Sequence, residues 1–286
     1  HLSIRRQRQM CIRDRAGIVV QNTPFGNIVS AAEHAIALLF ATARHVARAD
    51  REMRAGQWPK KGLTGVELYA KVLGVVGLGK AGSIVARVGK ALGMEVLVYD
   101  PYVTDRKVAD AGYAKADLET LLQRSDFVSL HTPLTPETKG LLNKERLAKM
   151  KKTARLVNAA RGGIVPEADL IEALKNGTIA AAGLDVFEKE PLPEDSPLRS
   201  VENLVLTPHL GASTEEAQER VAEDIARQFV EFFRDGVIRN AVNVPVTLDP
   251  NIAPFAKLAE LLGSMAAQMA GQAVKTLKVS CAGRLA

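Results

Sequence analysis

The sequence VLGVVGLGKAG at residues 72–82, together with VLVYD at residues 96–100, decides the fold of this chain. An apolar strand, a glycine turn, a helix and a second strand ending in an acid follow one another there, as in a dinucleotide-binding βαβ unit. Gly77 allows the tight turn, Gly79 lets the backbone approach a pyrophosphate, and Gly82 permits close packing of the helix on the strand. The N-terminus of that helix offers unpaired N–H groups to the phosphates.

Asp100 closes the second strand, 18 residues after Gly82. A carboxylate at this point accepts hydrogen bonds from the adenosine ribose hydroxyls and repels a 2′-phosphate, so NAD is favoured over NADP. A glycine pattern of this kind also occurs in ordinary turns. Here an apolar strand precedes it, residues 83–92 follow as a helix, and an acid ends the unit. These neighbours favour a cofactor site.

Strands and helices alternate through most of the chain. Apolar runs predict strands at residues 72–76, 96–99, 127–130, 155–158, 181–185 and 204–206, and helices are predicted between them at residues 83–92, 117–123, 144–150 and 167–177. This alternation predicts right-handed crossovers and a doubly wound parallel sheet of the α/β class, which is a Rossmann-type domain. We expect the chemistry at the carboxyl ends of the strands.

Two elements are predicted before the glycine stretch. Residues 17–24 are interpreted as a short buried strand, and Ser30 then caps a helix over residues 31–55, with Glu33 completing a capping box. The helix is apolar on more than one face. It is therefore expected to pack against another surface, such as that of a second subunit in a homo-oligomer formed through the cofactor domain.

The composition is typical of a packed α/β protein. Apolar residues make up 47% of the 286 residues, and no run approaches the ~20 apolar residues of a membrane span, so no membrane role is expected. Cys11 and Cys281 lie near opposite ends, without a CxxC motif or a histidine cluster. Neither a disulfide framework nor a metal site is predicted, and the cytoplasm is the expected compartment.

The net charge of +6 is concentrated at the start of the chain. Residues 1–15 contain five arginines against Asp14, which gives +4 and leaves +2 for the other 271 residues. Because the body is nearly neutral, no nucleic-acid partner is expected. Residues 1–15 lack helical or strand periodicity, an initiator Met and an apolar export segment. We interpret them as a foreign or mis-assembled segment, with a basic arm or targeting segment as the alternative.

Three chemically capable residues, Arg161, Glu190 and His209, each come just beyond a different predicted strand. Each has an ordinary explanation by itself: a cation near a helix start, a solvated acid beside a proline, and a histidine satisfied within a turn. The carboxyl ends of parallel strands share one edge of the sheet. The order of these residues therefore allows all three side chains to point into one crevice.

Several motifs, in order along the chain, resemble those of the D-isomer-specific 2-hydroxyacid dehydrogenases. The resemblance runs from Ala16 to about Val244, and its motifs are NTP at 22–24, SAAEH at 30–34, the glycine pattern at 77–82, NAARGG at 158–163, DVFEKEP at 185–191 and TPHLGA at 207–212. It implies an NAD-dependent dehydrogenase acting on a small 2-hydroxy acid. It further implies that Arg161, Glu190 and His209 are the catalytic set.

The same resemblance implies the cofactor contacts. Lys80 and Ala81 would cap the pyrophosphate, Asp100 would hold the ribose, and Asp185 would orient the nicotinamide carboxamide. Further contacts along the dinucleotide groove are implied for Pro101, His131, Thr132, Pro133, Ala159, Ala160, Gly211 and Ala212. The resemblance implies no metal.

Oxidation of a 2-hydroxy acid removes a hydride from C2 and a proton from the hydroxyl, so the site needs a base that is active near neutral pH. His209 is predicted to be that base, since an ordinary imidazole has a pKa of about 6.5. Glu190 would fix the tautomer of the ring and stabilise the imidazolium. Arg161 would pair with the substrate carboxylate through two N–H groups.

The C-terminal part predicts a further domain. After a helix at residues 215–236, residues 253–269 are interpreted as an amphipathic helix leading into a strand at 274–280. This region resembles the point where long-form D-3-phosphoglycerate dehydrogenases pass into an additional regulatory domain. We therefore divide the chain into a non-native or disordered segment at 1–15, an NAD-binding domain with crossover helices at 16–241, and the truncated start of a regulatory domain at 242–286.

The substrate favoured by this resemblance is 3-phospho-D-glycerate, oxidised to 3-phosphohydroxypyruvate in serine biosynthesis. The family's other domain, which grips the substrate, would precede residue 22, and the fragment alone is therefore expected to be inactive. Two alternatives stay open. One is another D-2-hydroxy acid of the glycerate, hydroxypyruvate or lactate type, and the other is a corepressor-like module that senses NAD(H).

Overall fold

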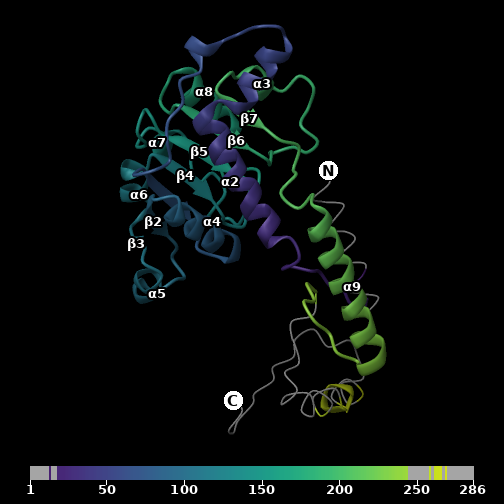
Figure 1. Cartoon of the computed structure of the whole chain (residues 1–286). Helices are drawn as coiled ribbons and strands as arrows, with labels where there is room; N and C mark the ends of the chain where they lie inside the picture. The colour runs from purple at the N-terminus through teal and green to yellow at the C-terminus, as the bar shows by residue number, and fades with distance from the viewer. Residues whose placement is uncertain (1–12, 14–17, 244–257, 259–260, 266–267, 269–286) are drawn as a thin grey trace. The chain divides into compact units, whose positions relative to one another are not determined.

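Figure 1 shows the computed structural model of the chain, which describes residues 13, 18–243, 258, 261–265 and 268. The chain forms two compact units. One consists of Phe25–Ala222, and the other combines His1–Pro24 with Glu223–Ala286. The first unit contains the sheet and the residues predicted to form the site.

The first unit is built on a seven-stranded sheet in the order β3-β2-β1-β4-β5-β6-β7, with every neighbouring pair parallel. The strands are β1 (Val72–Val76), β2 (Glu95–Tyr99), β3 (Ala114–Lys115), β4 (Phe127–Leu130), β5 (Arg155–Asn158), β6 (Ala181–Leu184) and β7 (Leu204–Leu206). The predicted doubly wound parallel sheet is confirmed, and each of the six predicted strands is placed to within one residue. The short edge strand β3 was missed by the sequence pattern.

Helices cover both faces of the sheet (Figure 1). Helices α2 (Ile28–Arg44) and α4 (Lys80–Ala91) share one apolar core with alternate strand residues such as Val75 and Val157. The opposite core joins the intervening strand residues, such as Leu130, to α6 (Leu118–Arg124), α7 (Lys144–Leu147) and α8 (Glu167–Lys175). Burial on both faces explains why these strands are continuously apolar.

The predicted single helix over residues 31–55 is wrong, because it is broken at His45. Helix α2 ends at Arg44, His45 is left-handed at φ 53°, and the polar helix α3 (Val46–Arg54) follows. The returning chain causes the break: the Val66 N–H donates to the Ala43 carbonyl over 3.0 Å, and Gly65 packs against the same carbonyl. The last carbonyls of a helix lack intrahelical partners, and here the returning chain supplies a donor to one of them.

The predicted capping box at Ser30 and Glu33 is also wrong. Helix α2 begins at Ile28, one turn earlier than the capping pattern indicates, and Ser30 lies buried inside it. The Ser30 hydroxyl is 2.8 Å from the Thr214 Oγ1. This distant partner satisfies the hydroxyl that was expected to cap the helix.

The strand predicted at residues 17–24 does not form in the described residues 18–24. Gln21 makes an isolated antiparallel bridge to Ala241, supported by a 2.9 Å bond from the Val242 N–H to the Val20 carbonyl. This segment therefore pairs with the chain beyond α9 (Glu215–Asp235) instead of joining the parallel sheet.

The remaining elements are α5 (Asp105–Asp110), α9 (Glu215–Asp235), and the short 3-10 turns η1 (Lys60–Gly62) and η2 (Pro197–Ser200). Helix α9 confirms the helix predicted at 215–236. Of the helix predicted at 253–269, the described residues Leu258, 261–265 and Gln268 are helical, and the strand predicted at 274–280 lies outside the described residues. Among the described residues, no helix has the length and apolar character needed to cross a bilayer.

Substituting Gly82 by alanine tests the close approach of α4 to the end of β1. A Cβ at residue 82 would lie 2.0 Å from the Gly77 carbonyl oxygen, a backbone atom that cannot rotate away. We expect Gly82→Ala to lower the free energy of unfolding by at least about 2 kcal/mol, although alanine has the higher helix propensity. Gly62→Ala is the matched control, since nothing lies within 4 Å of its added Cβ. Urea denaturation with equal midpoints for the two variants would contradict this packing.

Candidate active site

The glycine turn forms a cradle that is closed by His131 beside Gly77 and open at Gly79. Gly77 has φ 93°, and an added Cβ there would meet the His131 carbonyl oxygen at 2.8 Å. Gly79 has nothing within 4 Å of an added Cβ, and it caps α4 without a side-chain hydrogen bond. The first N–H groups of α4 are therefore not covered by a capping side chain, as an anion site at a helix N-terminus requires.

Asp100 is drawn in to this cradle from the end of β2. Its side chain is buried, with Oδ2 accepting from the Leu78 N–H over 2.7 Å and Oδ1 accepting from the Tyr102 N–H over 2.8 Å. The carboxylate is thus fixed beside the glycine turn. Its remaining acceptor positions are compatible with ribose hydroxyls.

The Thr132 hydroxyl is a buried polar group without a hydrogen-bond partner among the described residues. Its Cγ2 lies 3.0 Å from the position of an added Cβ at Gly77, so this side chain belongs to the cradle. Buried polar groups are rarely left unpaired, and a bound ligand is one way to satisfy them. The open Gly79 backbone and the unpaired Thr132 hydroxyl therefore fit a dinucleotide.

The other predicted cofactor residues follow the carboxyl ends of the same parallel strands. Lys80 is the first residue of α4, with its Nζ 3.0 Å from the centroid of the Phe25 ring. At this edge of the sheet Pro101 and Pro133 are exposed and Gly211 is buried. The half-buried ones are Ala81, Ala159, Ala160 and Ala212. This shared edge is the usual place for a ligand in an open parallel sheet.

His209 and Glu190 are in direct contact. The His209 Nδ1 lies 2.7 Å from the Glu190 Oε2, and the Glu190 Oε1 accepts from the Phe187 N–H over 3.0 Å. The imidazole is about half exposed, with a side-chain exposure of 48%. His209 has φ 57°, a left-handed conformation that costs a non-glycine residue on the order of 1 kcal/mol.

Arg161 lies on the neighbouring loop after β5. Asn158 fixes that loop by accepting from the Ala160 N–H over 3.1 Å and donating to the Arg161 carbonyl over 2.9 Å. Gly162 packs on the Phe187 carbonyl, so the loop adjoins the segment that leads to Glu190. The Arg161 side chain is exposed and bonds the Ala160 carbonyl. In the described part of the chain it is bonded to neither Glu190 nor His209.

Asp185 points inward to the loop that carries His209. Its carboxylate is fully buried and accepts from the Leu210 N–H over 2.8 Å, the Gly211 N–H over 2.9 Å and the Thr207 hydroxyl over 2.6 Å. A fourth neighbour is His34 of α2, whose Nε2 lies 3.1 Å from Oδ1. The role predicted for Asp185 toward the nicotinamide stays a prediction.

Sequence reasoning missed His34 and Ser129 as members of this region. Ser129 is fully buried in β4, with its Oγ 2.8 Å from the His131 Nε2. His34 lies inside the SAAEH motif, and the signal was a polar residue next to the buried Ala35 of α2. Its partner is 151 residues away, so the sequence could not indicate the contact.

Desolvation lowers the pKa of the His131 imidazole to about 4. His131 is therefore neutral at pH 7 and is a weak base there. Its backbone closes the cradle beneath Gly77, and the Gly82 Cβ position lies 3.3 Å from the His131 Cβ. The structure thus gives His131 a place in the wall of the cofactor site.

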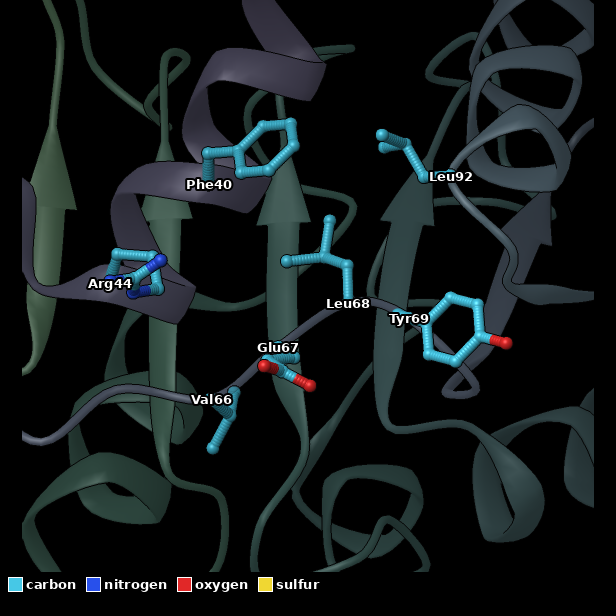
Figure 2. Close-up of a pocket in the computed structure, with 7 residues that line it drawn as sticks. All are labelled: Phe40, Arg44, Val66, Glu67, Leu68, Tyr69 and Leu92. Atoms are coloured by element: carbon cyan, nitrogen blue, oxygen red, sulfur yellow. The ribbon is translucent and has the colours of Figure 1, made fainter.

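The first unit has several hollows. Figure 2 shows a cavity of about 510 Å³ that contains none of the predicted site residues and is lined by Phe40, Arg44, Val66, Glu67, Leu68, Tyr69 and Leu92. A second, of about 340 Å³, is lined by Asp100 and Pro101 together with Tyr99, Asp105, Lys115, Ala116 and Asp117. The second hollow adjoins the predicted ribose position. In the described residues, no group of three His, Cys, Asp or Glu side chains is arranged to hold a metal ion.

Comparison with known proteins gives a consistent result. Residues 36–211 match the model of the D-isomer specific 2-hydroxyacid dehydrogenase, NAD binding domain. The chain is 48% identical over 276 residues to the D-3-phosphoglycerate dehydrogenase of Synechocystis sp., covering 95% of this chain and 50% of that protein. It is also 48% identical over 274 residues to the enzyme of the same name from Archaeoglobus fulgidus, covering 94% and 52%. The chain thus spans about half the length of the curated relatives it matches.

Solved structures agree with the fold. The apo-structure of D-lactate dehydrogenase from Escherichia coli matches with a TM-score of 0.74 and 33% identity, over 80% of this chain and 72% of that one. D-lactate dehydrogenase from Aquifex aeolicus, complexed with NAD and lactic acid, matches with a TM-score of 0.71 and 31% identity, over 83% and 77%.

Acidification tests the environment of His131. Because its folded pKa of about 4 lies below the ordinary 6.5, the unfolded chain binds more protons between these values, and stability falls as the pH is lowered through that window. We expect this group to contribute up to about 3 kcal/mol of that loss, and His131→Gln to flatten the slope. His45→Asn, at a partly exposed histidine outside the cradle, is the control. Equal pH slopes for all three proteins would contradict the assignment.

Proposed function

Because this chain belongs to the D-isomer specific 2-hydroxyacid dehydrogenase family, we propose that it forms the NAD-binding and catalytic part of an enzyme that oxidises a D-2-hydroxy acid. The proposed substrate is 3-phospho-D-glycerate, and the proposed product is 3-phosphohydroxypyruvate, in serine biosynthesis. The observation that carries the proposal is the 2.7 Å contact between His209 and Glu190 at the edge of the sheet that holds the glycine cradle.

His209 acts as the general base in this proposal. Its Nδ1 is engaged by the Glu190 carboxylate, which leaves Nε2 to take the proton of the substrate hydroxyl. A carboxylate on the far nitrogen fixes that tautomer and stabilises the imidazolium that forms. Glu190 is itself held by the Phe187 N–H, so the pair is oriented by the backbone.

Arg161 binds the substrate carboxylate. Its guanidinium is exposed at the same edge of the sheet, and the Asn158 turn fixes the backbone from which it extends. A guanidinium can donate two parallel hydrogen bonds to a carboxylate, which lysine cannot match. In the reverse direction it can polarise the 2-oxo group.

NAD supplies the hydride chemistry when it is bound. The residues proposed to hold it are the cradle of Gly77, Gly79 and Gly82, the carboxylate of Asp100 and the hydroxyl of Thr132. Their geometry fits a dinucleotide through an open helix N-terminus and a buried hydroxyl that lacks a partner among the described residues. The proposed contacts of the remaining groove residues rest on their position at the same edge.

The substrate proposal rests on the relatives. Those named D-3-phosphoglycerate dehydrogenase reach 48% identity, whereas the two D-lactate dehydrogenase structures are 31% and 33% identical. We propose that residues 16–241 form the NAD-binding domain with its crossover helices and that residues 242–286 begin a regulatory domain. The family match covers residues 36–211, which lie inside the first of these segments.

A homo-oligomer formed through the cofactor domain is part of this proposal. Several large apolar side chains of the α2 and α3 region are exposed, namely Val29, Phe40, Val46, Met53 and Trp58. Exposed apolar side chains gathered in one region are typical of association surfaces. The cytoplasm, favoured by the sparse use of cysteine, is the proposed compartment.

Substitution of His209 tests the proposed reaction. In the full-length protein, His209→Ala should lower the rate of NADH formation from 3-phospho-D-glycerate by roughly 10²- to 10⁴-fold, the range expected for loss of a general base. The affinity for NAD should change little, because the side chain contacts Glu190 and not the glycine cradle. His45→Asn serves as the control. A rate unaffected by His209→Ala would place the base elsewhere, and activity on D-lactate alone would overturn the substrate proposal.

A further inference from the structure

Asp185 is a fully buried carboxylate whose charge needs an explanation. A buried carboxylate is costly unless hydrogen bonds and opposite charge compensate it. Two backbone N–H groups and the Thr207 hydroxyl donate to it. Within the described part of the chain, its one ion-pair contact is with His34.

The number of available protons shows whether His34 donates or accepts in this contact. The single hydroxyl proton of Thr207 is donated to the Asp185 Oδ1 over 2.6 Å. The His34 Nε2 then lies 2.9 Å from the Thr207 Oγ1 and 3.1 Å from the Asp185 Oδ1, two atoms that face it as acceptors. A nitrogen between two acceptors must carry a proton to bond either of them. His34 is therefore a donor to the Asp185 and Thr207 pair.

The segment held by this pair is the one that presents His209. Thr207, Leu210 and Gly211 all donate to Asp185, and His209 lies between them with its left-handed backbone. The His209 side chain points to Glu190, whereas Asp185 accepts from the Thr207 hydroxyl before it and from the Leu210 and Gly211 N–H groups after it. The position of the imidazole thus depends on a carboxylate that does not touch it.

Helix α2, which carries His34, packs closely against the elements on both sides of Asp185. Ala32 and Ala35 on either side of it are fully buried, and the Cβ position of Gly183 in β6 lies 3.3 Å from the Leu38 Cβ. The Cβ position of Gly211 is 3.7 Å from Ala31 of the same helix. The helix therefore contacts both the strand before Asp185 and the loop after it.

We propose that His34 is a positioning residue, which donates from Nε2 to Asp185 and Thr207 and thereby holds residues 207–211 in the conformation that presents His209. The catalytic meaning of this positioning rests on the proposed function. The structural claim concerns hydrogen bonds of the chain itself, and it is measured without cofactor or substrate. Its failure is therefore distinguishable from failure of the proposed reaction.

The first test is made on the unmodified chain. Long-range ¹H–¹⁵N NMR of the imidazole rings at pH 8 reports which nitrogen of each histidine carries the proton, and the chain has five histidines to assign. The expected result is a proton on the His34 Nε2. A neutral ring with its proton on Nδ1 would overturn the proposal, whatever any variant does.

The second test compares amide hydrogen exchange in His34→Leu, His34→Gln and the control His45→Asn. His34→Leu removes the donor and should accelerate exchange of the Leu210 and Gly211 amides by at least about tenfold, with the Val157 amide of β5 unchanged. His34→Gln places an N–H donor near the former Nε2 and should restore slow exchange, and His45→Asn should have no effect.

Three results of the second test would contradict the proposal. Exchange at Leu210 and Gly211 could be unchanged in His34→Leu, or it could accelerate together with Val157, as expected for general destabilisation. Failure of His34→Gln to restore slow exchange would show that ring volume, and not the donor, matters. If His34→Leu does not fold, the ring measurement on the unmodified chain decides the matter.

Discussion

Helix α4 can reach the end of β1 only because residue 82 has no side chain. The Cβ position of Gly82 lies 2.0 Å from the Gly77 carbonyl oxygen, so the helix N-terminus sits directly above the glycine turn. The hydrogen-bond ladder extends past the strand ends: the Gly77 N–H donates to the Tyr99 carbonyl, and the His131 N–H donates to the Val76 carbonyl. The contact between Gly82 and the Gly77 carbonyl fixes the cradle. The parallel order of the strands brings every other site loop to the same edge.

Two carboxylates, those of Glu190 and Asp185, hold His209 at the same edge of the sheet. Glu190 contacts the His209 ring, whereas Asp185 binds the Thr207 hydroxyl before His209 and the backbone N–H groups after it. Four contacts to the buried Asp185 can offset the cost of the left-handed backbone at His209, which would otherwise be an unfavourable place for an imidazole. In the proposed reaction, a general base at His209 would benefit from such a fixed position.

Local sequence patterns predicted most of the fold and several of the candidate site residues. The glycine spacing and Asp100 are signals within 30 residues of one another, and each apolar strand is indicated by its own residues. The order of Arg161, Glu190 and His209 followed from strand ends. What failed depended on distant partners. Ser30 bonds Thr214 across 184 residues, the end of α2 is set by the returning Val66, and His34 finds Asp185 across 151 residues. In each case a tertiary contact decides the structure, and the neighbouring sequence does not predict that contact.

The glycine cradle and Asp100 are proposed to form a site for NAD. Isothermal titration of the chain with NADH and with NADPH tests this proposal. Asp100 is buried against the cradle, and the 2′-phosphate of NADPH would bring like charge to it, so we expect NADH to bind at least about tenfold more tightly. Equal affinities for the two cofactors, or no binding of NADH, would contradict the account.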